Sequence, residues 1–195
     1  MPPLQNRVDP FGALHGIPAR GTMMGNRGGR FHRPDRTLGA RRWASRQWIC
    51  CVCTFKGRKR PVWAARTYSE LFFLDEVTAL AAGHRPCFEC RRPDALAFRA
   101  RFGNGRMTAG EMDVVLHGQR LAGPHDMAMR DLPDGAMIAR GDAAFAVRGD
   151  RLLPWSFAGY GVALARPAAG MAAVLTPRAV VEVLARGYAP SWHGG

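Results

Sequence analysis

The sequence predicts one α+β protein. Short apolar runs of strand-forming residues alternate with segments that carry helix start and stop signals. A length of 195 residues suits a single domain, and a hydrophobic fraction of 47% is enough for a core. We expect a basic arm over residues 1–46, a unit with helices over 47–122, and a small β-rich C-terminal lobe with a terminal helix over 123–195.

The first segment, residues 1–46, is rich in Gly, Pro, Arg and Asn. Its stretch 19–30 has neither a helical nor a strand period. We therefore expect an arm or an ordered basic loop and not a separate domain. Packing onto the body would come from its apolar side chains, Phe11, Leu14, Met23 and Met24.

Strand-forming residues follow at 47–55 and again at 68–74. Asp75 is then placed to cap a short helix over 76–82, which Gly83 would end. The predicted order in this part of the chain is therefore strand, strand, helix.

Two longer helices are expected next. Pro93 opens the first, which runs to about Phe102. Thr108 and Glu111 have the spacing of a capping box before the second, over 112–121.

From Pro133 onward, the sequence pattern predicts short strands. Gly149-Asp150 stands between two apolar runs and predicts a hairpin. Thr176 as N-cap, Pro177 as first residue and Gly187 as stop bracket a final helix. The expected strands are 136–139, 143–148 and 151–155, and the expected helix is 178–186.

The net charge of +13 is concentrated in the first third of the chain. Residues 1–66 carry 12 Arg and 2 Lys against Asp9 and Asp35 only. Such a block of positive charge favours binding to the phosphates of a nucleic acid, because each phosphate that is neutralised releases counterions. The alternative is a compositional bias, since Arg outnumbers Lys 26 to 2. No run of eighteen apolar residues and no apolar signal core at the N-terminus are present, so we expect no membrane span and a cytoplasmic protein.

Five cysteines lie within 41 residues of one another: Cys50, Cys51, Cys53, Cys87 and Cys90. An odd count without a secretory signal argues against a disulfide framework. Cys87 and Cys90 form a C-x-x-C, a spacing that lets two thiolates grip one tetrahedral metal ion. A second thiol cluster upstream could complete the set, and this donor chemistry favours zinc. The alternatives are buried small hydrophobes or a redox dithiol.

Strand alternation selects the partners of Cys87 and Cys90. Side chains of a strand alternate between faces, so Cys51 and Cys53 should point one way and Cys50 the other. A bulge would make Cys50 and Cys53 possible instead, and His84 is a further candidate. The predicted zinc ligands are Cys51, Cys53, Cys87 and Cys90.

The segment from Leu71 to Arg91, LFFLDEVTALAAGHRPCFECR, resembles the metal-binding domain at the N-terminus of the Ada DNA-repair protein. The resemblance implies a small zinc-bearing ββα-like unit near residues 47–92. It also implies an upstream thiolate, on Cys50 or Cys51, that takes a methyl group from a DNA phosphotriester. The upstream run Cys-Cys-Val-Cys departs from the family, in which three residues separate the first two cysteines.

The leading hypothesis from the sequence is a zinc-stabilised nucleic-acid-binding protein, with DNA as the expected partner. The alternatives are a zinc-thiolate methyl acceptor and a structural zinc module that binds another protein. Basic side chains around the cysteines would meet the phosphates: Lys56, Arg58, Lys59, Arg60, Arg85, Arg91 and Arg92.

Overall fold

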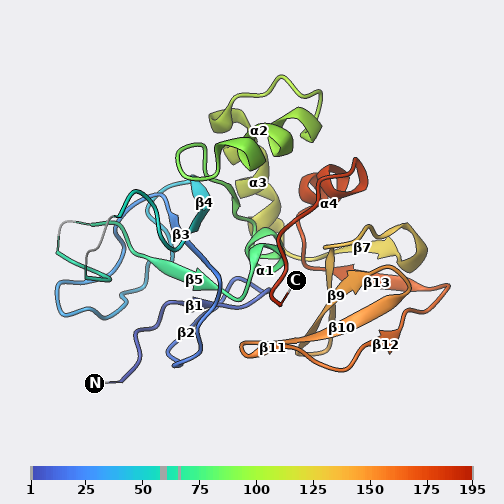
Figure 1. Ribbon diagram of the computed structural model, residues 1–195, viewed down its shortest axis with the longest axis horizontal. Coiled ribbons are helices and arrows are strands. Elements are labelled where there is room, and N and C mark those ends of the chain that lie inside the picture. The colour runs from blue at the N-terminus through green and yellow to red at the C-terminus, as the bar shows by residue number, and fades with distance from the viewer. Residues whose placement is uncertain (1, 58–60, 66, 195) are drawn as a thin grey trace.

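The computed structural model describes residues 2–57, 61–65 and 67–194. Over these ranges the chain forms four α-helices and two β-sheets, which confirms the α+β class. Figure 1 shows the two sheets side by side, with helix α1 between them and helices α2, α3 and α4 on one side. No helix in the described ranges is long and apolar enough to cross a membrane.

The first sheet has six strands in the order β2-β1-β5-β3-β4-β6. Pairing is parallel between β1 and β5 and between β4 and β6, and antiparallel elsewhere. The strand bounds are Arg7–Val8 for β1, Leu14–His15 for β2, Met23–Arg27 for β3, Trp48–Val52 for β4, Leu71–Phe73 for β5 and Arg85–Pro86 for β6.

The expectation of an arm or loop is wrong for the stretch 19–30, because β3 lies within it and near the middle of this sheet. Its sequence, MMGNR, carries a glycine where the neighbours leave no room for a side chain. A Cβ on Gly25 would lie 2.3 Å from the carbonyl oxygen of Ile49. Of the apolar side chains expected to order the segment, Leu14 and Met23 are buried and Phe11 is 45% exposed.

Insertion of β3 also alters the expected ββα-like unit. The strands β4 and β5, which lie within residues 47–92, do not pair with each other, since β3 lies between them. The cysteine-bearing segments are thus parts of the six-stranded sheet, and the described residues form no separate unit of that kind.

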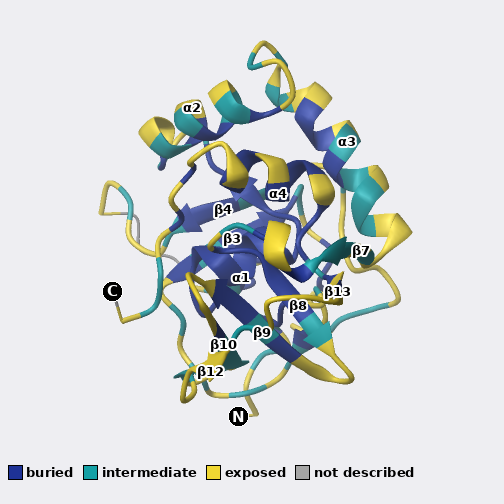
Figure 2. Ribbon diagram, turned by 90° about the vertical axis from the view of Figure 1, so that its right-hand side faces the viewer, coloured by how far each residue is buried: buried dark blue, intermediate teal, exposed yellow. Residues whose placement is uncertain are grey.

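Helix α1 (Glu76–Ala81) is the central element of the fold. Asp75 caps it as predicted, since its carboxylate accepts a hydrogen bond from the Thr78 N–H at 2.9 Å. All six residues of the helix are buried, as Figure 2 shows. Ala79 packs against the first sheet, whereas Val77 packs against the second. The helix therefore joins the two sheets.

The second sheet is antiparallel, with the order β11-β10-β9-β8-β13-β7 and β12 paired to β10. The predicted hairpin at Gly149-Asp150 joins β9 to β10. The bounds are His125–Ala128 for β7, Met137–Arg140 for β8, Ala143–Arg148 for β9, Arg151–Ser156 for β10, Gly159–Tyr160 for β11, Leu164–Ala165 for β12 and Met171–Val174 for β13. A 3₁₀ turn at Met129–Asp131 follows β7.

The other helices, α2 (Arg92–Arg101), α3 (Ala109–Ala122) and α4 (Arg178–Ala185), pack with the second sheet around one apolar core. The capping box of α3 is present as predicted. The N-cap of α4 is Pro177 and not Thr176. The Thr176 hydroxyl instead accepts a hydrogen bond from the Met137 N–H at 2.8 Å.

Candidate metal centre

The upstream thiol of the centre belongs to Cys51 in β4. In the antiparallel pair β3–β4, Met24 lies opposite Cys51, and Asn26 lies opposite Ile49. These four side chains share one face of the sheet because successive residues of a strand alternate. Cys51 is 6% exposed on this face.

The other two thiols follow β6, which pairs in parallel with β4. Pro86 lies opposite Cys50, so the next residues along the two strands, Cys51 and Cys87, come side by side. The Cys87 N–H donates to the Cys50 carbonyl oxygen at 2.9 Å and extends this pairing by one step. Parallel pairing of two short strands therefore brings the upstream thiol to the C-x-x-C turn.

The turn itself has the expected features of a metal-binding knuckle. The Glu89 N–H donates to Sγ of Cys87 at 3.4 Å, and the Arg91 N–H donates to the Cys87 carbonyl oxygen at 3.0 Å. Backbone N–H groups that point at a sulfur stabilise its thiolate form and fix its direction. Helix α2 begins directly after the turn, and its N-terminus favours negative charge nearby.

The ligand atoms of Cys51, Cys87 and Cys90 all lie within 4.8 Å of one another. Thiolates that share one tetrahedral metal ion, with metal–sulfur bonds of about 2.3 Å, lie roughly 3.8 Å apart. The three sulfurs therefore need to move little to share one ion. The three cysteines are placed to hold a metal ion.

The thiols of this cluster also perturb one another. The hydrogen bonds of Cys51 with Cys87, the larger cause, and with Cys90 raise the pKa of the Cys51 thiol. The same contact with Cys51 lowers the pKa of Cys87 to about 5 and lowers the pKa of Cys90. Cys87 and Cys90 thus favour the thiolate form, and a bound cation would also favour loss of the proton from Cys51.

Cys50 lies outside the cluster, as the alternation of β4 predicts. It is fully buried in the core of the first sheet with Leu71 and Phe73. The Arg91 guanidinium donates to its Sγ at 3.6 Å, and burial raises the pKa of its thiol. A fully buried thiol cannot reach a DNA phosphotriester, so the acceptor role that the resemblance offers to Cys50 does not fit this structure.

The predicted ligand Cys53 is not brought to the three sulfurs in the described structure. Strand β4 ends at Val52, so the alternation that would align Cys53 with Cys51 stops one residue too early. Cys53 is exposed, and its thiol donates to the Thr22 carbonyl oxygen at 3.4 Å. His84, the further candidate, is fully buried against Trp48 and Phe73 and also lies outside the cluster.

A cavity of about 250 Å³, here called the thiol cavity, opens beside the cluster. Its wall includes all three clustered cysteines, Cys53, and aromatic side chains from two other segments, Tyr68 and Phe72. Residues Met24 and Asn26 of β3 also line it. The sequence did not place these two residues at the candidate site, because β3 was not predicted. The MMGNR stretch has no alternation of apolar and polar residues that would indicate a strand.

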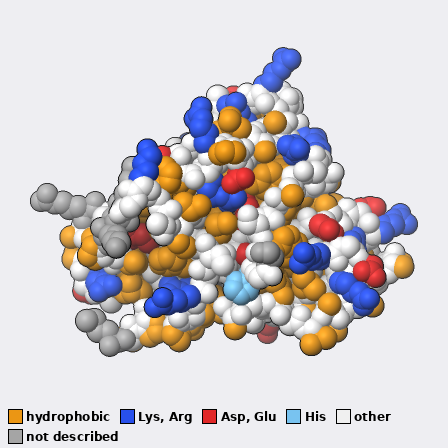
Figure 3. All heavy atoms as spheres, viewed as in Figure 1, with side chains coloured by type: hydrophobic (Ala, Val, Ile, Leu, Met, Phe, Trp, Pro, Cys, Tyr) orange, Lys and Arg blue, Asp and Glu red, His pale blue; other side chains and the backbone are white. Residues whose placement is uncertain are grey.

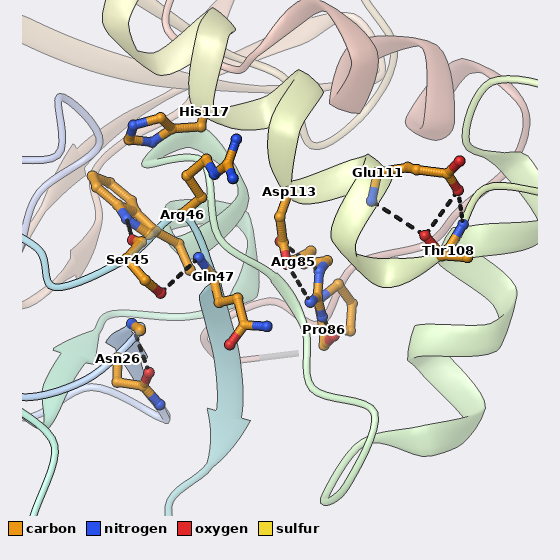
Figure 4. Close-up of polar contacts among 12 residues, drawn as sticks. Asn26, Ser45, Arg46, Gln47, Arg85, Pro86, Thr108, Glu111, Asp113 and His117 are labelled. Atoms are coloured by element: carbon orange, nitrogen blue, oxygen red, sulfur yellow. Dashed lines mark hydrogen bonds and ion pairs between the residues drawn. The ribbon is translucent and has the colours of Figure 1, made fainter.

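Two of the predicted phosphate-binding arginines are buried in ion pairs. Arg85 is 4% exposed and binds Asp113 of α3 through two hydrogen bonds of 2.9 and 2.8 Å, as Figure 4 shows. Arg91 is also 4% exposed and binds Glu76 at 2.7 Å. Phosphate contact by these two side chains is not compatible with their burial, so this part of the prediction is wrong.

Lys56 and Arg92 are exposed, as contact with phosphate requires. Arg58, Lys59 and Arg60 lie outside the described residues. Figure 3 shows the Lys and Arg side chains of one face in separate groups and not in one continuous patch.

Comparisons of this chain with protein families, with curated proteins and with solved structures found no match. The resemblance to the Ada metal-binding domain therefore stays a prediction.

Proposed function

We propose that this protein binds one zinc ion through Cys51, Cys87 and Cys90 and uses a thiolate of this centre to accept an alkyl group from a nucleic-acid phosphotriester. The observation that carries the proposal is a cluster of three thiols on the wall of a cavity. Structural zinc sites are closed by four protein ligands, whereas reactive sites keep one position open. Three clustered sulfurs beside a cavity fit the second pattern.

The donor set fits zinc, because thiolate sulfur is a preferred ligand of this ion. Bound zinc would hold the sulfurs deprotonated at neutral pH and offset the repulsion between their charges. The backbone N–H of Glu89 supports the same charge state on Cys87. Cys51 is the acceptor that combines the resemblance with a place on the cavity wall.

The chemical step is a displacement at carbon. The Cys51 thiolate attacks the methyl carbon of a methyl phosphotriester, an S–C bond forms and the C–O bond breaks. The electron pair of the broken bond leaves with the phosphate oxygen, and the triester becomes a phosphodiester anion. The product on the protein is a thioether, so each chain reacts once.

Intact-mass analysis after incubation with methylphosphotriester DNA tests this function. We expect the mass of one added methyl group on the wild-type chain, and no addition on Cys51→Ser. The matched control is Cys50→Ser, which removes a thiol on the other face of β4 and should still be methylated. Wild-type protein that holds zinc and gains no methyl group would reject the acceptor role.

A second candidate function keeps zinc structural within a nucleic-acid-binding protein. Its support is the place of Cys53 on the wall of the thiol cavity, from which a shift of the chain after β4 would supply a fourth sulfur. Under this candidate, Cys53→Ser lowers zinc affinity at least tenfold and no thiol is methylated. Zinc affinity that is unchanged in Cys53→Ser favours the open, reactive site.

A further inference from the structure

A second cavity lies beside the opposite face of strands β3 and β4. Its volume is about 300 Å³. Arg27 and Trp48 are directly paired across β3 and β4, so both point away from the face that carries Cys51. We call this site the arginine–tryptophan cavity after five of the residues that line it, Arg27, Arg42, Trp43, Trp48 and Arg120.

Among the residues that the structure describes, three cations and no carboxylate line this cavity. Arg27 is 1% exposed, and its guanidinium donates to the Gly12 carbonyl oxygen at 2.8 Å and to Nε2 of His84 at 3.3 Å. Arg120 donates from Nε to the Gly83 carbonyl oxygen at 2.8 Å. Its Nη2 is buried and has no hydrogen-bond partner among the described residues. These partners are neutral, so they satisfy some of the donors without pairing the two positive charges.

The acidic residues that interact electrostatically with Arg27 and Arg120 are Asp9 and Asp113, and each of them is paired with another side chain. Asp9 binds His15 at 2.7 Å, and Asp113 binds Arg85. Burial, foremost, lowers the pKa of both Arg27 and Arg120 to about 9. A guanidinium stays charged in proteins, so the burial of these two cations is unfavourable unless an anion lies nearby. A bound anion would remove that penalty.

The cavity also offers an aromatic surface. The guanidinium carbons of Arg27 and Arg120 lie 3.9 and 4.5 Å from the ring centre of Trp48, so this indole supports the two cations. Trp43 lies next to Trp48, with 5.9 Å between ring centres, and is 38% exposed. An exposed indole beside arginines can stack a planar base while the cations bind a phosphate.

We propose that the arginine–tryptophan cavity binds one nucleotide unit, with its phosphate met by Arg42 and Arg120 and its base stacked on Trp43. The unit is either a free mononucleotide or one residue of a single strand, since both present the same phosphate and base. The volume of the cavity lies at the lower end of the range for small-ligand sites, which suits one such unit. The proposal does not rest on the metal centre, which uses the other face of the sheet.

Titration calorimetry with AMP tests the site on the full-length protein. We expect measurable binding at micromolar to millimolar AMP and at least a tenfold loss of affinity in Arg120→Gln, Arg42→Gln and Trp43→Ala. Arg42 and Trp43 are exposed, so these two variants should fold even if Arg120→Gln does not. The matched control is Arg151→Gln, an exposed arginine on β10, which should bind AMP as the wild type does.

Inorganic phosphate and single-stranded oligothymidylate complete the experiment. Phosphate should bind at least tenfold more weakly than AMP, because it lacks the stacked base. Competition between the oligonucleotide and AMP would identify a strand as the source of the unit, and its absence would identify a free nucleotide. No AMP binding at millimolar concentration, phosphate binding as tight as AMP binding, or equal affinity in Arg42→Gln, Trp43→Ala and Arg151→Gln would overturn the proposal.

Discussion

Cys50 and Cys51 are consecutive in the chain, yet their side chains lie on opposite faces of β4. Cys50 is fully buried against the core of the first sheet, and Cys51 joins Cys87 and Cys90 on the wall of the thiol cavity. A step of one residue along the strand therefore separates a thiol that packs in the core from a candidate metal ligand.

The two neighbouring cysteines should respond differently to the same substitution. Cys50→Ser places a hydroxyl in an apolar core and should lower the free energy of unfolding by about 1–3 kcal/mol, with metal content unchanged. Cys51→Ser should lose metal. Metal analysis and urea unfolding of both variants check this prediction, and equal metal contents would contradict it.

The buried pair of Arg85 with Asp113 should be important for stability. Asp113→Ala leaves a buried guanidinium without its anion, so we expect a loss of about 3–5 kcal/mol in the free energy of unfolding. The matched control is Asp131→Ala, which removes an exposed partner of Arg130 and should change stability little. Similar losses in both variants, measured by denaturant unfolding, would show that the pair is not buried as described.

The position of β3 predicts the effect of a single methyl group. Gly25→Ala would bring a Cβ to 2.3 Å from the Ile49 carbonyl oxygen and 2.8 Å from the Phe73 ring, so the strands must separate. We expect a loss of at least about 2 kcal/mol in the free energy of unfolding. Gly118→Ala in α3 is the control, because nothing lies within 4 Å of the added Cβ and Ala favours a helix. A neutral Gly25→Ala would argue against β3 in the sheet.

His84 predicts a pH dependence of stability. Burial, followed by the charges of Arg27 and Arg120, holds the pKa of His84 well below 6.5. The unfolded chain therefore binds a proton near pH 6.5 that the folded chain does not. Stability is fully present above this pH and falls below it, by up to about 1.4 kcal/mol per pH unit.

Urea unfolding of the wild type and of His84→Gln, each at pH 7 and pH 5, isolates the contribution of His84. Three other histidines also have a lowered pKa and lose stability in the same direction, but they are present in both proteins: His32, His117 and His125. The variant should lose less stability than the wild type between the two pH values. Equal losses would mean that His84 is protonated in the folded protein.

Local signals in the sequence predicted much of the fold. The cap of α1, the capping box of α3 and the hairpin at Gly149-Asp150 depend on residues a few positions apart, and all three are present. Strand β3 depends on pairing with partners far along the chain, and its Gly25 fits because those partners leave no space. Such a position carries no local sign in the sequence.

The same distinction applies to the candidate site. Alternation along β4 correctly separated Cys51 from Cys50, but it failed for Cys53 because the strand ends at Val52. Burial of Arg85 was also not visible in the sequence, since its partner Asp113 lies 28 residues further along. Side chains that meet only through the tertiary fold need the structure.

Zinc content measured after purification tests the central claim most directly. We predict one zinc ion per chain in the wild type and in Cys50→Ser, and loss of that ion in Cys51→Ser, Cys87→Ser and Cys90→Ser. A wild-type chain that takes up no zinc, or a Cys51→Ser variant that keeps a full equivalent, would contradict the assignment of these three thiols as one metal centre.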